Sequence, residues 1–104
     1  MISSGRAFFT AAILVLTLLL AAACESAPPV QEMSDARQAI AVAREAGAES
    51  YATEELLEAE LFLKSAEQKL GAEEYREARR AALQAKASAL DATEHSEAHR
   101  TDKN

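Results

Sequence analysis

Apolar residues recur at steps of three and four in three separate segments of the chain, which is the spacing of one face of an α-helix. The segments run from about Val30 to Ala46, from Thr53 to Leu70 and from about Glu73 to about Glu97. Short polar stretches containing glycine separate them, and a longer apolar run precedes them. The pattern predicts an all-α fold, a short antiparallel three-helix bundle or helical hairpin preceded by an N-terminal helix.

The first segment has one apolar face, formed by Val30, Met33, Ala36, Ile40 and Ala43. Two starts are open for this helix. Ser34 would cap it with Asp35 in the first turn, or Pro29 would occupy a first-turn position. Gly47 is predicted to end the helix as a left-handed residue after the C-cap.

The second segment is the most apolar of the three. Thr53 is its predicted N-cap and Gly71 its predicted stop. A wide stripe is expected to pack on both neighbouring helices and consists of Leu56, Ala59, Phe62, Leu63, Ala66 and Leu70. Leu57 and Leu61 fall on the opposite side. They are either scattered surface leucines or a contact for another copy or a partner.

The third segment carries a seam made almost entirely of alanine, which lets two helix backbones approach closely. The seam consists of Tyr75, Ala78, Ala82, Ala85, Ala89 and Ala92, flanked by Leu83 and Leu90. Alanine has the highest helix propensity, so this helix should form easily while gaining little from burial. From His95 onward we expect the helix to fray.

The N-terminal apolar run has the layout of a secretory signal. Arg6 supplies the positive start, Ala7–Leu20 the apolar middle and Ala21–Ala23 the small residues of a cleavage site. The alternative is a retained transmembrane helix. Because a span needs about 20 apolar residues and this run falls slightly short, we favour the signal.

The end of this run resembles a bacterial lipobox, with three alanines directly before Cys24. Alanine stands at Ala21, where leucine is usual. The resemblance implies cleavage between Ala23 and Cys24 and acylation of Cys24 with chains such as palmitate, which would anchor the protein to a membrane. Glu25 after the cysteine favours the outer membrane over the inner membrane on the same resemblance.

These features divide the chain into four predicted parts. They are a lipoprotein signal peptide at 1–23, an acylated tether at 24–31 stiffened by two prolines, an Ala-rich three-helix domain at 32–98 and a polar tail at 99–104.

Charge and cysteine content narrow the partners. The formal net charge of the 104 residues is −6, and removal of 1–23 takes away Arg6 and no acidic residue, which leaves −7. So acidic a chain is not expected to bind nucleic acid, and attachment to anionic lipid would have to come from the acyl group. With one cysteine, no internal disulfide can form. A chain this small buries a modest core, so self-association or an envelope protein partner would stabilise it.

A short internal repeat marks both predicted breaks between helices. Gly47–Tyr51 reads GAESY and Gly71–Tyr75 reads GAEEY. Each copy is expected to stop a helix at its glycine and to place a tyrosine at the corner.

From Pro29 to Ala92 the pattern resembles a small bacterial family of lipoprotein domains of unknown function, often fused to OmpA-like peptidoglycan-binding domains. The resemblance lies in the proline, the Ala-Gly-Ala around Gly47, Tyr51, and the Leu/Ala and Ala-rich helices that follow. The family often has proline where Thr53 stands. Leu70–Ala85 also resembles half of a tetratricopeptide repeat, which suggests a peptide-binding groove only faintly, because such arrays need about three units.

Two groups of side chains are candidates for chemistry. His95 and His99 lie one helical turn apart, but a metal site needs three or four ligands, so no metal is expected. Arg76, Arg79 and Arg80 could hold an anionic ligand such as a phosphate. Pairing with nearby glutamates on the helix surface, as Glu60 would pair with Lys64, is the simpler interpretation.

The sequence therefore predicts a non-enzymatic, lipid-anchored envelope protein whose bundle acts as a binding or scaffold module, with no cofactor. No nucleophile and base set or phosphate loop is recognisable, and a thin bundle should have little room for a cleft of about 300 Å³. The alternatives are a rod like the murein lipoprotein, which Gly47 and Gly71 would interrupt, and a carrier of an anionic envelope ligand.

Overall fold

The computed structural model describes residues 2–25 and 27–102, with side chains for 5–19 and 27–102. Within these residues all regular secondary structure is helical, and short turns join the helices. The helices are α1 (Ile2–Glu25), α2 (Val30–Glu45), α3 (Ala48–Tyr51), α4 (Thr53–Gly71) and α5 (Tyr75–Asp102). The predicted all-α class is confirmed.

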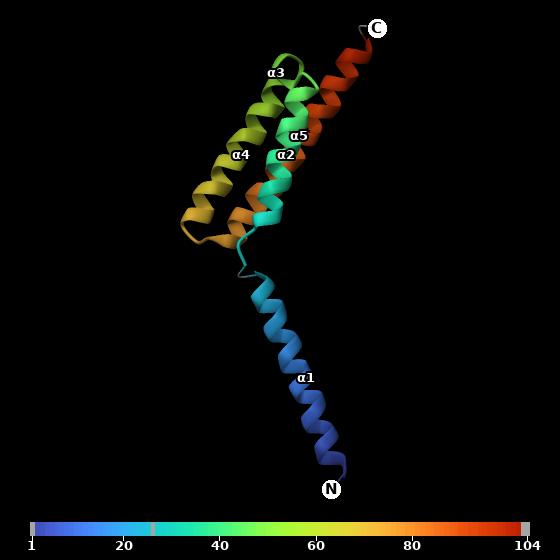
Figure 1. The fold of residues 1–104 in the computed structure, drawn as a ribbon, viewed down its shortest axis with the longest axis vertical. Coiled ribbons are helices and arrows are strands. Elements are labelled where there is room, and N and C mark those ends of the chain that lie inside the picture. Colours follow the sequence, from blue (N-terminus) through green and yellow to red (C-terminus); the bar gives the residue numbers. More distant parts are fainter. Residues whose placement is uncertain (1, 26, 103–104) are drawn as a thin grey trace.

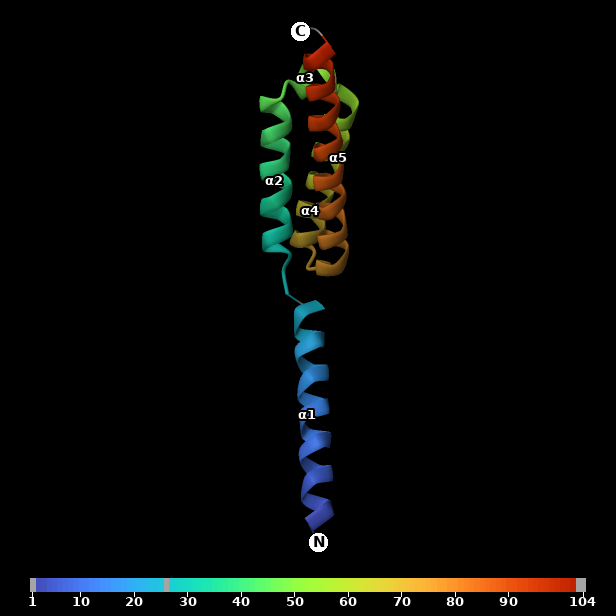
Figure 2. The same cartoon turned by 90° about the vertical axis from the view of Figure 1, so that its right-hand side faces the viewer.

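Helices α2, α4 and α5 lie side by side as a bundle, and α1 extends away from it (Figures 1 and 2). α4 runs antiparallel to the other two, so α2 and α5 run in the same direction and the one-turn helix α3 caps the far end. In this arrangement α5, and not α4 as predicted, is the helix that packs extensively on both neighbours, while α2 and α4 touch each other much less.

The alanine seam explains why α5 takes the shared position. Its buried residues are small throughout, namely Ala78, Ala81, Ala82, Ala85, Ser88, Ala89, Ala92 and Ser96. Larger side chains of the other helices, such as Met33, Ile40 and Leu56, are also buried in the core beside this seam. The buried hydroxyl of Ser96 donates to the carbonyl oxygen of Ala92 at 2.7 Å. Small residues on α5 thus let two helices approach it closely.

The first helix of the bundle begins at the earlier of its two predicted starts. Pro29 is the residue before α2, and its carbonyl oxygen accepts from the backbone N–H of Met33 at 3.1 Å. Ser34 lies inside the helix and is exposed. At the other end Gly47 has φ +94°, which confirms the predicted left-handed stop.

The predicted cap of α4 is wrong. Thr53 is the first residue of the helix rather than its N-cap, and its hydroxyl donates to the carbonyl oxygen of Glu49 at 3.1 Å. Because residues 48–51 themselves form a helical turn, the hydroxyl lies within reach of that turn's carbonyl. The corner is therefore held from the α3 side.

The second corner differs from the first despite the shared sequence motif. Gly71 is the last residue of α4 and is not left-handed; Glu73 takes that conformation, with φ +61°. The backbone N–H groups of Glu73 and Glu74 bond to the carbonyl oxygens of Leu70 and Lys69 at 3.0 and 2.9 Å. These two bonds form a Schellman motif with a glutamate at the position where glycine is usual.

The last helix is longer than expected. It continues to Asp102 without the predicted fraying from His95. Both histidines contact the corner formed by α3 and the start of α4, which accounts for the extra turns. Over the described residues, no helix combines the length and the apolar character needed to cross a membrane.

Candidate functional site

The outer face of α4 carries the two leucines that were predicted as a possible partner contact, and both are exposed. Leu57 and Leu61 are 55% and 59% exposed, while Leu56 and Ala59 on the other side of the helix are buried. The side chains that surround the two leucines are all exposed and are Glu54, Glu58, Lys64 and Gln68. Within the described part of the chain, no ion pair engages Glu54, Glu58 or Lys64. The structure thus places the predicted partner face in solvent.

The arginine cluster at the start of α5 divides into one engaged and two free side chains. Arg79 Nε lies 3.2 Å from Glu32 Oε1, and Arg79 Nη2 donates to the carbonyl oxygen of Ala27 at 2.9 Å. Arg76 and Arg80 are exposed, and no ion pair to another described residue involves them. Arg79 therefore ties the tether and α2 to α5, which leaves two of the three arginines open to a ligand.

Ion pairs in this bundle join different helices rather than neighbours on one helix. The predicted pair of Glu60 with Lys64 is not formed, and neither are pairs of Arg76 or Arg80 with the preceding glutamates, among the residues described. Glu60 pairs instead with Arg44 of α2. The helices lie close enough for side chains to reach across, and this contact competes with local pairing. Apart from the pair of Arg79 with Glu32, which is less than one-third exposed, these pairs are largely open to solvent, so each contributes about 0–1 kcal/mol to folding.

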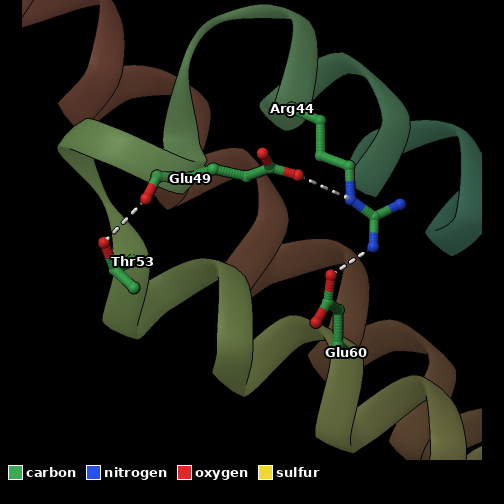
Figure 3. Close-up of polar contacts among 4 residues, drawn as sticks. All are labelled: Arg44, Glu49, Thr53 and Glu60. Atoms are coloured by element: carbon green, nitrogen blue, oxygen red, sulfur yellow. Dashed lines mark hydrogen bonds and ion pairs between the residues drawn. The ribbon is translucent and has the colours of Figure 1, made fainter.

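Arg44 connects three elements at the upper end of the bundle. Figure 3 shows its guanidinium between Glu49 of α3 and Glu60 of α4, with Arg44 Nε 3.8 Å from Glu49 Oε1. Below it, Arg37 Nη2 lies 3.4 Å from Glu67 Oε1. Between α2 and α4 lies a surface groove of about 350 Å³, whose lining includes Ile40, Leu63 and these charged side chains.

The two histidines lie at the corner of α3 and α4, not at a frayed end. His95 Nδ1 and Glu55 Oε1 are 2.5 Å apart, and the His99 ring stacks on Tyr51 with centroids 5.5 Å apart and planes 13° from parallel. The backbone N–H of Glu55, and next the hydrogen bond with His95, hold the pKa of the Glu55 carboxyl below its ordinary value of 4.5. Both contacts fasten the end of α5 to the corner.

A second open cleft, of about 410 Å³, lies at this corner. Its lining residues are Ser50, Tyr51, Ala52, Thr53, Glu54, Glu55, His95 and His99. Clefts above about 300 Å³ do therefore exist on this bundle, contrary to the prediction. The described residues contain no group of three or more histidine, cysteine or acidic side chains arranged to hold a metal ion.

The predicted lipidation and cleavage positions, Cys24 and Ala23, lie in the last turn of α1. Their side chains are outside the described part of the chain. Ala27 is three residues beyond Cys24, and Arg79 holds its carbonyl oxygen against the base of the bundle.

Sequence reasoning missed Arg79 as the residue that links the tether to the bundle. Its partners are 47 and 52 positions away in the chain, so local spacing could not reveal the contact. Only a weaker signal was available in the sequence. Arg79 lies near the start of α5 and Glu32 near the start of α2, and these two helices start at the same end of the bundle.

Comparison with known proteins gives one family. The model described as "Domain of unknown function (DUF4398)" matches residues 31–104, which includes all but the first residue of the described bundle. No curated protein and no solved structure matches the chain significantly.

Proposed function

The chain belongs to this family of domains of unknown function, and we propose that it is a lipid-anchored protein of the bacterial cell envelope whose bundle serves as a non-catalytic binding or scaffold module. The observation that carries the proposal is Cys24, which directly follows an apolar run and three alanines. Acylation there would attach the bundle to the periplasmic face of a membrane, with the outer membrane favoured by Glu25.

The contacts of Arg79 support a bundle whose base is held close to that membrane. Three residues of extended chain span at most about 11 Å, so an anchor at Cys24 would keep Ala27 near the lipid headgroups. Arg79 fixes Ala27 to the base of the bundle.

The side-chain inventory supports a binding role over catalysis. The clefts are open and lined by charged groups that already pair across helices. The outer face of α4 offers apolar side chains without a cover. A surface of this kind binds another helix more readily than it binds a small molecule.

The two alternative functions receive less support. A continuous rod needs an uninterrupted helix, and the bundle reverses direction at residues 46–52 and 72–74. A carrier of an anionic ligand would rely on Arg76 and Arg80, because Arg79 is engaged with Glu32.

Intact mass spectrometry of the full-length gene product extracted from bacterial membranes tests the anchor. We expect the mass of residues 24–104 plus acyl chains, and loss of that species in the Cys24→Ala variant. Detection in the membrane of the entire, unprocessed chain without acyl groups, in both the natural protein and the Cys24→Ala variant, would overturn the proposal.

A further inference from the structure

The uncovered face of α4 has a pattern that reads the same in both directions except for the sign of its charges. Successive helical residues are 100° apart, and five of the exposed residues of α4 fall within an arc of about 80°. They are Glu54, Leu57, Leu61, Lys64 and Gln68. From Glu54 to Lys64 the steps are three, four and three residues, symmetric about the level of Ala59.

Such a pattern is complementary to itself when two copies of α4 lie antiparallel. A two-fold axis at the level of Ala59 places Leu57 against Leu61 of the second copy, and the reverse. The same axis places Glu54 against Lys64 of the second copy at both ends of the four leucines. A parallel pair would instead place each glutamate against a glutamate and each lysine against a lysine.

Among the residues that the structure describes, no ion pair engages Glu54 or Lys64, so both charges are available for that contact. The ion pairs that α4 makes with other helices use residues outside this arc. They join Glu55 to His95, Glu60 to Arg44 and Glu67 to Arg37. Glu58 lies about 80° from the centre of the uncovered face, at its rim, where water and salt screen its charge.

We propose that the outer face of α4 binds a second copy of this chain, with the two α4 helices antiparallel around the level of Ala59. The contact is small, since each copy adds two half-exposed leucines, and it must offset the loss of translational and rotational freedom on association. It is therefore weak between free molecules in dilute solution. Confinement of both copies to one membrane raises their effective concentration, and in this respect the inference rests on the proposed anchor. The antiparallel pair places the two bases at opposite ends, so both anchors reach the same membrane when the bundles lie along its surface.

Disulfide formation tests the register. Two tagged full-length versions, one with Leu57→Cys and one with Leu61→Cys, are expressed together and oxidised in membranes. We expect the mixed disulfide between positions 57 and 61 to exceed the two like-position disulfides at least about fivefold, and a version with Cys24 alone is the background. Like-position links in excess, or no link above background, would refute the antiparallel pair.

Charge exchange tests the complementarity. By energy transfer between labelled copies in vesicles, Glu54→Lys alone and Lys64→Glu alone should each weaken association about tenfold, because two favourable pairs become two repulsive ones. The double exchange should restore association to within about threefold of the natural chain. A double variant no better than either single variant counts against the proposal.

A matched leucine on another helix serves as the control. Leu57→Ser should abolish the energy transfer, whereas Leu83→Ser, which replaces a leucine 52% exposed on α5, should leave it unchanged. Equal loss in both variants would contradict a specific α4 contact. So would capture of a different envelope protein, in place of a second copy, by a photo-crosslinker at position 57.

The mass spectrum of the same membrane samples separates this inference from the proposed function. Disulfide-linked copies without acyl chains would support the α4 pair and refute the proposed lipid anchor. Acylated copies that form no mixed disulfide would support the lipid anchor and refute the α4 pair.

Discussion

Arg79 Nη2 donates a hydrogen bond of 2.9 Å to the carbonyl oxygen of Ala27, which joins the segment before α2 to the first turns of α5. The same guanidinium lies 3.2 Å from Glu32, so one side chain fixes both the tether and the start of α2. Both charged groups are less than one-third exposed. The contact sets the direction in which the chain enters the bundle.

Replacement of Arg79 by glutamine should therefore loosen the base of the bundle. We expect a loss of about 1 kcal/mol in the free energy of unfolding, because a partly buried Glu32 loses its charged donor. Backbone amide exchange should speed up in the first turn of α2 and not at the α3 corner. Arg76→Gln is the matched control; an equal loss there would show a general charge effect.

Gly47→Ala should destabilise the first corner. A Cβ at this position would lie 3.1 Å from Cδ2 of Tyr51, and φ of +94° is unfavourable for any L side chain. The expected cost is about 1–2 kcal/mol, or a fall in Tm of roughly 4–8 °C for each kcal/mol. Thermal unfolding followed by circular dichroism measures it. Gly71→Ala meets no atom within 4 Å and should leave Tm unchanged or higher.

Glu73→Gly should stabilise the second corner. Glu73 has a left-handed backbone, with φ of +61°, at the position of a Schellman motif that glycine occupies at least strain. We expect a gain of about 0.5–1 kcal/mol in chemical denaturation. The neighbouring change Glu74→Gly supplies no such relief, so a gain of the same size there would rule out backbone strain as the cause.

Ala85→Leu should strongly disturb the bundle. Ala85 is fully buried on the seam where α2 and α4 both approach α5. Overpacking of a close helix contact costs about 1–3 kcal/mol. Ala87→Leu adds the same side chain to the exposed side of α5 and should change Tm little. Similar melting of the two variants would mean that the seam is not closely packed.

Acid should weaken the contact between the α4 start and α5 through Glu55. Its carboxyl has a lowered pKa in the folded protein, so its contribution is fully present above 4.5, the ordinary value, and is lost as pH falls through the lower folded value. Urea midpoints measured between pH 6 and pH 3 should fall less steeply for Glu55→Gln than for the natural chain. Glu58 makes no ion pair with His95, so the Glu58→Gln variant should show the same fall of the urea midpoint with pH as the natural chain.

The helices and the left-handed stop at Gly47 could be predicted because they depend on local signals. Periodicity located three helices, and Gly47 is left-handed as its position after an Ala-rich helix indicated. The prediction of the second corner was wrong because it assumed that the glycine of the repeated motif, Gly71, would end the helix. The helix runs on through Gly71, since nothing there forces a positive φ, and the turn falls on Glu73 instead.

Contacts between helices were less predictable than the helices themselves. The helix that packs on both others is the one that both backbones can approach closely. The small alanines of α5 allow two such neighbours, whereas α4, which carries leucines, packs closely on α5 alone. The link from Arg79 to Ala27 and the pair of His95 with Glu55 join residues 52 and 40 positions apart. Neither pattern is visible until the helices are placed side by side.

The parallel course of α2 and α5 has a mechanical consequence. Because the bundle contains an odd number of long helices, the start of α2 and the end of α5 lie at opposite poles (Figure 2). A pulling force applied between those poles acts along the helix axes and shears the alanine seam as a whole, rather than opening it one turn at a time. Resistance to such a force is governed by the rate of unfolding, so a shallow core can still bear tension.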